Sequence, residues 1–247
     1  MPQPPLSSAE PTMPPRPLLQ TIFSSLTRAP SPSTTPSTST STPPSWTLLR
    51  TLKSENPNDI QGDLHGTATF TPLPPHRPQA PKAENEEEGG AEEHTDLLYS
   101  ESGSLPTSFG PGLRWTKKYI WRLSANGRIS VWFVKMDKKP SGQSSDAEEA
   151  DYLFHEFDFA ATASSEMNSA EFVAPPMPPE VPGLPRGATT KVIAARGNHL
   201  CIDDMYRTAY AFRVDEGSGE VLSWASRHVV RGPKKGQDIV NLYSRAA

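Results

Sequence analysis

One short stretch of the sequence brings together side chains of four reactive kinds. His199, Cys201, Asp204 and Tyr206 supply an imidazole, a thiol, a carboxyl and a phenol, and these groups can ligate a metal, attack an electrophile or transfer a proton. From Asp204 onward the residues alternate as in an extended strand, so that Asp204, Tyr206 and Tyr210 share one face. An aromatic strand face of this kind is typical of a strand that lines an interior.

These side chains converge only if the chain departs from a regular strand just before Asp204. The histidine and the cysteine have the opposite parity to Asp204, so we expect a bulge or turn near Asp203. Gly197-Asn198 is a turn signal, and it predicts that residues 191–196 pair with the stretch that follows. The candidate site therefore depends on the local backbone geometry of this segment.

The residue types in this cluster favour neither a metal site nor a reactive thiol. Cys201 is the only cysteine, and no paired-ligand spacing makes His199, Cys201, Asp204 and His155 a zinc site. A lone buried cysteine is more often an inert side chain than a nucleophile activated by a neighbouring histidine. We expect no bound metal; acid–base catalysis by Asp204, Tyr206 or His199 is an alternative function.

A second group of polar residues lies on predicted strands that are rich in aromatic side chains. Tyr99 and Glu101 share a strand face. A carboxylate that faces a barrel interior needs a charged partner, because an unpaired buried charge is strongly destabilising. Arg50, Arg114 and Arg122 are the available partners. Such a group is either a structural network that fixes strand register or a set of polar anchors in a ligand cavity.

Strand-like alternation recurs along most of the chain, with turn signals between the strands. Asn126-Gly127 predicts a hairpin between the two strands that flank it, and the strand at Trp46 can pair with the last strand. The sequence therefore predicts a mainly β protein, an antiparallel up-and-down β-barrel of about ten strands with a short N-terminal helix. The predicted strands lie near residues 46–52, 62–70, 97–103, 117–123, 128–135, 152–159, 191–196, 199–213, 221–231 and 238–245.

The remaining segments divide into an entry helix, a tail and inserts. Apolar residues at helical spacing predict an amphipathic helix over residues 18–28. Residues 1–17 are Pro-rich and are expected to be a disordered tail, and residues 18–247 are expected to form a single barrel domain. Four further segments are rich in Pro, Ser, Thr or acidic residues and are expected to be disordered inserts. These inserts lie near residues 29–44, 72–95, 137–150 and 163–186.

Composition limits the possible partners and compartments. The chain has 247 residues, 28 prolines and a net charge of −4, so neither a nucleic acid nor an anionic membrane surface is an expected partner. No apolar run is long enough to span a bilayer, and the single cysteine favours a reducing, cytoplasmic location. A group of basic residues near the C-terminus is expected to form a solvated rim. These residues are Arg227, His228, Arg231, Lys234, Lys235 and Arg245.

Several short motifs together resemble a known family. The motifs are Trp46-x-Leu48-x-Arg50, Gly62-x-x-x-Gly66, Tyr99-x-Glu101-x-Gly103, Arg114 followed by Tyr119 and Trp121, Phe154-His155, His199-x-Cys201-x-x-Asp204-x-Tyr206, Gly232-Pro233-x-Lys235 and Tyr243-x-Arg245. The sequence is similar to an uncharacterised domain-of-unknown-function family of fungi and actinobacteria, which is pictured as a lipocalin-like (calycin-type) β-barrel. The resemblance implies a barrel with a polar-lined cavity and implies no known activity. Gly236 departs from the acidic residue expected after Lys235.

The function that these patterns favour is binding of a small apolar or amphipathic molecule inside the barrel. Aromatic side chains would form the walls of the cavity, and polar side chains would anchor the ligand. The predicted ligand-binding residues are Glu101, Tyr119, Trp121, Arg122, His199, Cys201, Asp204, Tyr206, Tyr210 and Lys235. The alternatives are the acid–base enzyme and a filled barrel that serves as a protein-interaction module. The sequence identifies no cofactor and no oligomeric state.

Overall fold

The computed structural model describes residues 14–28, 44–75, 93–135, 148–159, 172–184, 187–233 and 235–245. Within these ranges it contains an N-terminal α-helix, a short 3-10 helix and ten strands. In chain order they are α1 (Arg16–Ser25), β1 (Ser45–Ser54), β2 (Gly62–Pro72), β3 (His94–Ser104), η1 (Thr107–Phe109), β4 (Arg114–Ser124), β5 (Ile129–Val134), β6 (Ala150–Glu156), β7 (Thr190–Cys201), β8 (Asp204–Asp215), β9 (Val221–Arg231) and β10 (Gly236–Arg245).

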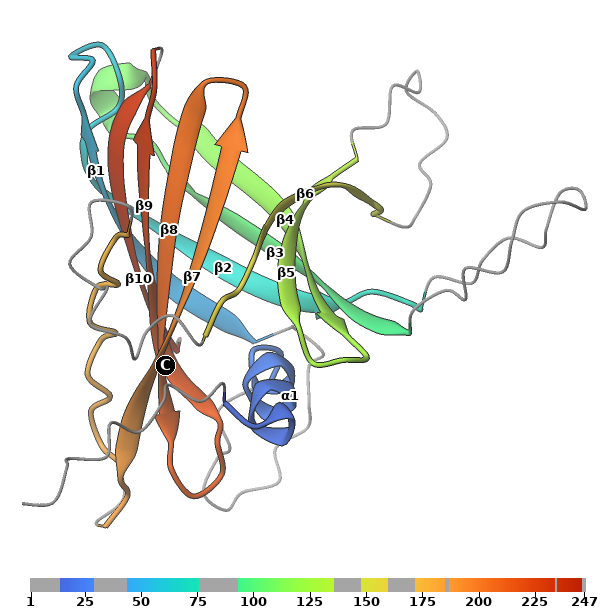
Figure 1. The fold of residues 1–247 in the computed structure, drawn as a ribbon. Helices are drawn as coiled ribbons and strands as arrows, with labels where there is room; N and C mark the ends of the chain where they lie inside the picture. Colours follow the sequence, from blue (N-terminus) through green and yellow to red (C-terminus); the bar gives the residue numbers. More distant parts are fainter. Residues whose placement is uncertain are drawn as a thin grey trace, which may run out of the picture.

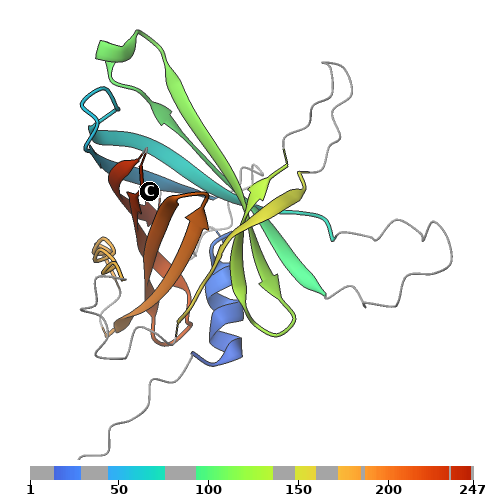
Figure 2. The same cartoon turned by 45° about the horizontal axis from the view of Figure 1, so that its top comes forward.

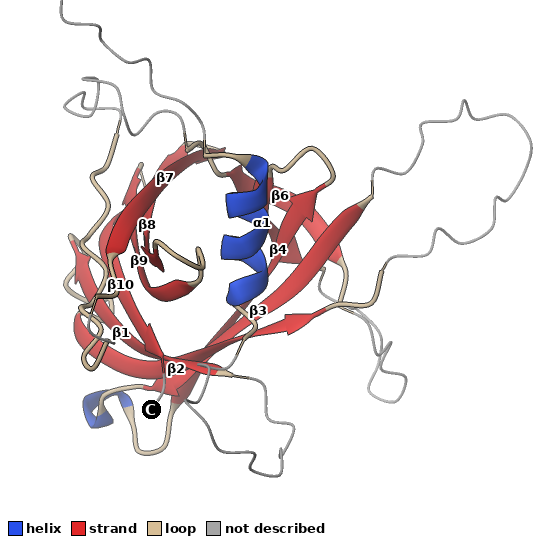
Figure 3. Ribbon diagram, turned by 90° about the horizontal axis from the view of Figure 1, so that it is seen from below, coloured by secondary structure: helices blue, strands red, loops and turns tan. Residues whose placement is uncertain are grey.

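All ten strands belong to one antiparallel sheet that curls into a nearly closed barrel (Figure 1). Their order is β6-β5-β4-β3-β2-β1-β10-β9-β8-β7, so consecutive strands pair except β6 and β7, and β1 pairs with β10. Figure 3, a view down the barrel axis, shows the strands arranged in a ring. The predicted fold class, an antiparallel up-and-down barrel of about ten strands with a short helix, is confirmed.

The barrel is closed between β6 and β7, where the sheet order ends. There the backbones of Asp158 and Arg196 form an isolated antiparallel bridge, with N–H···O distances of 2.7 and 2.9 Å. Gly197 makes this close approach possible, because a Cβ atom at this position would lie 2.4 Å from Cδ2 of the His155 ring. The pairing of the Trp46 strand with the last strand is confirmed, with Trp46 opposite Arg245.

The turn of the β7–β8 hairpin differs from the prediction. The chain reverses at Ile202 and Asp203, and Gly197-Asn198 lies inside β7. Ile202 has a φ of 58° and is 88% exposed at the tip of the hairpin. The predicted interruption near Asp203 is confirmed as a turn, which pairs Cys201 with Asp204 so that the side chains on the two strands share a face. The prediction of a turn at Gly197-Asn198 was wrong.

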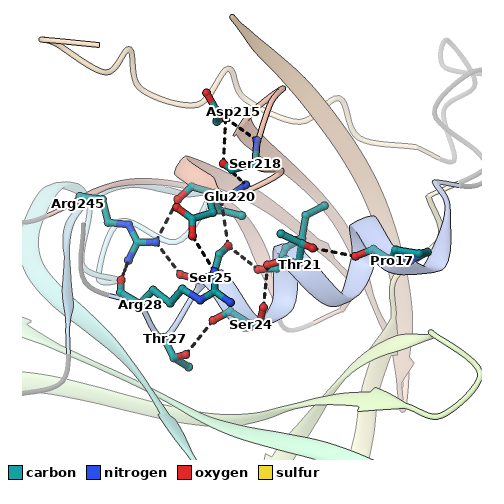
Figure 4. A network of polar contacts seen from close by, with 12 residues as sticks. Pro17, Thr21, Ser24, Ser25, Thr27, Arg28, Asp215, Ser218, Glu220 and Arg245 are labelled. Atoms are coloured by element: carbon teal, nitrogen blue, oxygen red, sulfur yellow. Dashed lines mark hydrogen bonds and ion pairs between the residues drawn. The ribbon is translucent and has the colours of Figure 1, made fainter. Parts of the chain in front are cut away.

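Helix α1 covers one end of the barrel (Figures 2 and 3). Its apolar stripe, Leu19, Ile22 and Phe23, is buried, as the helical spacing predicts. Figure 4 shows how β10 holds the helix C-terminus, since Arg245 donates to the carbonyl oxygens of Ser25, Arg28 and Val221. The same guanidinium lies 3.9 Å from the centre of the Trp46 ring.

The predicted tail and inserts lie mostly outside the described residues. Of the last insert, predicted over 163–186, residues 172–184 are described, and they contact the outer face of β8 and β9. Arg213 on β8 donates to the carbonyl oxygen of Pro178 at 3.2 Å, and Ser223 on β9 donates to that of Pro179 at 2.6 Å. The described part of this segment is thus held against the barrel by hydrogen bonds.

Candidate functional site

A cavity of about 250 Å³ lies inside the barrel. Its lining combines aromatic and aliphatic side chains with charged and hydrogen-bonding ones, all from the inward faces of strands. The lining residues are Arg50, Tyr99, Glu101, Lys117, Tyr119, Trp121, Val131, Phe133, Phe154, Tyr206, Tyr210, Trp224, Ser226, His228, Val230, Gln237, Ile239, Asn241 and Tyr243. The barrel is therefore not completely filled by its own side chains.

A buried ion pair between Arg50 and Glu101 is the centre of the polar lining. Nη2 of Arg50 donates to Oε1 of Glu101 at 2.7 Å, and Nε donates to Oδ1 of Asn241 at 2.7 Å. The other carboxylate oxygen accepts a hydrogen bond from the Tyr99 hydroxyl, which lies 2.8 Å from the hydroxyl of Tyr243. We call these five residues the buried polar network. Arg50 and Glu101 are only 5% and 4% exposed, so each requires the other as a counter-charge.

The geometry of the barrel wall brings Arg50 to Glu101. The two residues lie on β1 and β3, which are separated by β2, where Gly66 and Ala68 are small. The guanidinium also lies 4.6 Å from the centre of the Trp115 ring. That ring packs against glycine backbone, since a Cβ atom at Gly66 would lie 3.0 Å from it.

The network raises the pKa values of both Arg50 and Tyr99. Burial alone would lower the pKa of Arg50, but the charge and hydrogen bond of Glu101 together with Tyr243 and Tyr99 outweigh it and raise the pKa. The pKa of Tyr99 is well above its usual value, because the phenol is desolvated and its anion would lie beside Tyr243 and Glu101. The arginine is therefore charged and the tyrosine neutral over the physiological range.

Lys117 adds a second cation to the cavity lining. It lies on β4 directly opposite Glu101 on β3 and faces the cavity. Its side chain is exposed to solvent and borders the open cavity. Desolvation and the charge of Arg50 lower the pKa of Lys117, and Glu101 opposes this shift. Among the described residues no hydrogen bond or ion pair holds its ammonium group.

Aromatic rings form the walls and floor of the cavity. Trp224 stacks on Tyr243 with ring centres 3.5 Å apart, and Trp121 packs edge-on against Trp224 at 5.7 Å. Tyr119 stacks on Phe154 at 5.8 Å, and burial, with a contribution from Glu101, raises the pKa of Tyr119 to about 12. Within the described part of the chain, Nε1 of Trp224 is buried without a hydrogen-bond acceptor.

Two histidines lie in the interior and are held neutral. Nε2 of His155 lies 3.0 Å from the hydroxyl of Tyr210, and desolvation lowers the pKa of His155 well below its usual value. His228 lies 3.1 Å from the hydroxyl of Ser226 and borders the cavity. Desolvation, then the charges of Lys117 and Arg50, lower the pKa of His228 to about 3. The prediction that His228 belongs to a solvated basic rim is therefore wrong.

Half of the residues predicted to bind a ligand face this cavity. They are Glu101, Tyr119, Trp121, Tyr206 and Tyr210. Each lies on a strand face with other aromatic residues, which is the pattern from which it was predicted. The alternation of inward-facing and outward-facing residues along each strand was thus sufficient to predict that these five side chains face the interior.

Arg122, predicted as a polar anchor, lies on the outer face of β4. Its guanidinium makes two hydrogen bonds of 2.8 Å to the carboxylate of Asp96 and lies 5.0 Å from the centre of the Trp132 ring. The physical reason is parity, since Trp121 faces the interior and the next residue on a strand must face outward. Arg122 is therefore part of a structural pair outside the cavity.

The remaining predicted residues gather near the end of the barrel opposite α1. Lys235 donates to the Tyr206 hydroxyl at 2.5 Å and lies 3.8 Å from the carboxylate of Asp204. The hydrogen bond to Tyr206 raises the pKa of Lys235. His199 is opposite Tyr206, and Cys201 is opposite Asp204. None of these four remaining residues, His199, Cys201, Asp204 and Lys235, lines the cavity.

Several lining residues were missed by the sequence analysis. Arg50 was considered as a possible partner for Glu101 and as part of a family motif, Tyr243 appeared only in a family motif, and Lys117 and Asn241 were not singled out. The available signal was alternation on the last strand, where Ile239, Asn241 and Tyr243 share a face. A polar residue between two apolar ones on an inward face marks either a buried network or a ligand anchor.

Comparisons with known proteins identify a family and no characterised relative. A family model described as a family of unknown function, DUF6314, matches residues 43–176 and 184–245. Neither the curated proteins nor the solved structures gave a match. Over the described ranges no cluster of three or more potential metal-ligating side chains occurs. No helix in the described part of the chain is long and apolar enough to cross a membrane.

Proposed function

The chain belongs to DUF6314, a family of unknown function, and we propose that it binds a small molecule inside its barrel. The observation that carries this proposal is a cavity of about 250 Å³ with a charged network in its wall. Closed barrels of this kind either fill their interior with side chains or hold one small ligand. The aromatic surface would contact the body of the ligand, and the polar groups would orient it.

The polar lining supports ligand binding over a purely structural interior. A buried ion pair is often no more stabilising than apolar side chains of the same volume, because both charges must be desolvated. A barrel that serves only as a scaffold has no need of Arg50, Glu101 and Lys117 around an open space. In a ligand-binding barrel, these residues would form hydrogen bonds or ion pairs with polar groups of the ligand.

The size of the cavity limits the ligand to a small molecule. A cavity of roughly 150 Å³ holds benzene, so about 250 Å³ accommodates about ten non-hydrogen atoms. A molecule of this size can reach both the polar network and the apolar wall. The ligand proposed here is therefore a compact amphipathic molecule rather than an extended lipid.

A cavity-filling substitution tests the proposal. Ile239 on β10 faces the cavity, whereas its neighbour Val240 faces the opposite side of the sheet. Saturation-transfer NMR with a mixture of neutral, anionic and cationic fragments is expected to detect binding to the wild type and to Val240→Trp. Binding should be lost in Ile239→Trp, because the indole occupies the space of the ligand. Equal binding to both variants, or no fragment bound by the wild type, would contradict the proposal.

The alternative functions make different demands on the geometry. A filled interaction module needs no cavity. Acid–base catalysis by Asp204, Tyr206 or His199 requires a substrate that contacts these groups, and only Tyr206 lines the cavity. The relationship to lipocalin-like barrels, the fungal or actinobacterial origin, the cytoplasmic location and the single-domain organisation remain predictions from the sequence.

A further inference from the structure

We propose that the ligand is a small organic monoanion, a carboxylate with an apolar or aromatic body, and that Lys117 binds its carboxylate. This inference rests on the proposed function and specifies the chemical class of the molecule bound. It follows from the charges that line the cavity, from the state of Lys117 and from the distribution of apolar side chains.

The charges lining the cavity do not balance. Arg50 and Glu101 neutralise each other through a hydrogen-bonded ion pair of 2.7 Å. Lys117 is the other charged lining residue, and the lining histidine, His228, is neutral at physiological pH because its pKa is lowered to about 3. One positive charge remains, so a ligand with one negative charge neutralises the cavity and a dianion, such as a phosphate monoester, overcompensates it.

Lys117 has the donors to bind such a group. Its ammonium group can donate three hydrogen bonds, and no hydrogen bond or ion pair to another described residue uses them. The nearest counter-charge along the sheet, Glu101, is already bound to Arg50 and Tyr99. A ligand carboxylate beside Lys117 would gain charge-assisted hydrogen bonds and would relieve the repulsion between Lys117 and Arg50.

The rest of the cavity suits an apolar body attached to the carboxylate. Val131, Phe133, Phe154, Val230 and Ile239 contribute apolar surface to the same cavity. A cationic ligand would add a third positive charge near Arg50 and Lys117. A neutral ligand would bury the ammonium group against apolar surface without a partner, which is unfavourable.

Two probes of the same shape but different charge distinguish the effect of ligand charge on binding from the effect of ligand size. Para-fluorobenzoate and para-fluorobenzamide have about ten non-hydrogen atoms each, as the cavity requires, and differ in charge. Fluorine NMR titrations of the full chain should show that the acid binds. The amide should bind with an affinity at least about tenfold lower.

Neighbouring lysines on opposite faces of β4 provide a matched pair of variants. Lys117→Met should weaken para-fluorobenzoate binding about tenfold or more, whereas Lys118→Met should leave it unchanged, because Lys118 lies on the outer face in an exposed pair with Glu148. Lys117→Met should fold, because it removes a charge repelled by Arg50. Lys117→Arg retains the cation and should restore most of the affinity.

The outcomes distinguish this inference from the proposed function. Equal binding of acid and amide, unaffected by Lys117→Met, would overturn the monoanion assignment and leave small-molecule binding intact. Absence of acid binding to the wild type would also overturn the assignment, and the fragment mixture with Ile239→Trp would then decide the proposed function independently.

Discussion

Glu101 is the residue on which the buried polar network depends. It accepts hydrogen bonds from Arg50 and from Tyr99, and it is the counter-charge of a guanidinium that is 5% exposed. Breaking a buried ion pair by removing one partner costs about 3–5 kcal/mol, because the remaining charge is left without compensation. The network is therefore both a feature of the candidate site and a determinant of stability.

The substitution Glu101→Gln is expected to lower the free energy of unfolding by about 3–5 kcal/mol, since Arg50 stays buried and charged. Urea unfolding followed by tryptophan fluorescence measures this loss. Glu148→Gln is the control, because it breaks the more exposed Lys118–Glu148 pair on the outer face. That change should cost less than about 1 kcal/mol. Equal losses for the two variants would show that the inner pair has no special role.

His228 should make the stability of the protein depend on pH. Its pKa is lowered to about 3 in the fold, against about 6.5 in an unfolded chain, so the unfolded state takes up a proton first as the pH falls. The stabilisation from keeping this histidine neutral is complete above pH ~6.5 and is lost as the pH falls toward about 3. Between pH ~7.5 and ~5 the wild type should lose about 1–2 kcal/mol more than His228→Gln.

Urea unfolding at a series of pH values checks this prediction. His65→Gln is the control, since His65 on β2 is exposed and its replacement should leave the pH profile unaltered. His155 acts in the same direction, so it keeps some pH dependence in the His228→Gln variant. Identical profiles for wild type and His228→Gln would contradict the desolvation of a neutral imidazole beside the cavity.

Helix α1 shows how one element completes the barrel. Its apolar stripe packs into the open end of the sheet, and Arg245 on β10 binds its C-terminal carbonyl oxygens (Figure 4). Helical spacing in the sequence was enough to predict this helix and its buried face, because four apolar residues repeat every three or four positions. The interaction with Arg245 was not predictable, since it joins residues from the two ends of the chain.

The substitution Phe23→Ala should lower the free energy of unfolding by about 3–5 kcal/mol, because Phe23 is 2% exposed and its removal leaves a cavity under the helix. Gln20→Ala, on the exposed face of the same helix, should change it by no more than about 0.5 kcal/mol. Differential scanning calorimetry of both variants measures the difference. A small effect of Phe23→Ala would mean that the helix is only loosely attached to the barrel.

The β7–β8 hairpin shows where local sequence signals mislead. Gly197-Asn198 has the composition of a turn, yet Gly197 is needed inside β7 because the His155 ring packs against its backbone. The real turn at Ile202-Asp203 has no glycine, and Ile202 adopts a positive φ that its residue type disfavours. A glycine required by a contact with a distant strand cannot be distinguished, from sequence alone, from a glycine required by a turn.

At the scale of the whole molecule, alternation and turn signals predicted the strands, their antiparallel arrangement and the pairing of β1 with β10. They did not predict that the barrel is closed between β6 and β7, because that contact joins segments without a hairpin between them. They also left open which arginine pairs with Glu101. Arg50 reaches Glu101 because the register of three strands places it there.

A small molecule in the interior of the barrel would lie beside tryptophan side chains, whose NMR signals report its binding. The indole N–H signals of the isotope-labelled full chain can be assigned by replacing each of its 5 tryptophans with Phe. On titration with a bound fragment, the signals of Trp121 and Trp224, which line the cavity, should shift to saturation at one site. The signal of Trp132, on the outer face beside Arg122, should stay unchanged. A saturating shift at Trp132 with none at Trp121 or Trp224 would place the ligand outside the barrel and contradict the proposed function.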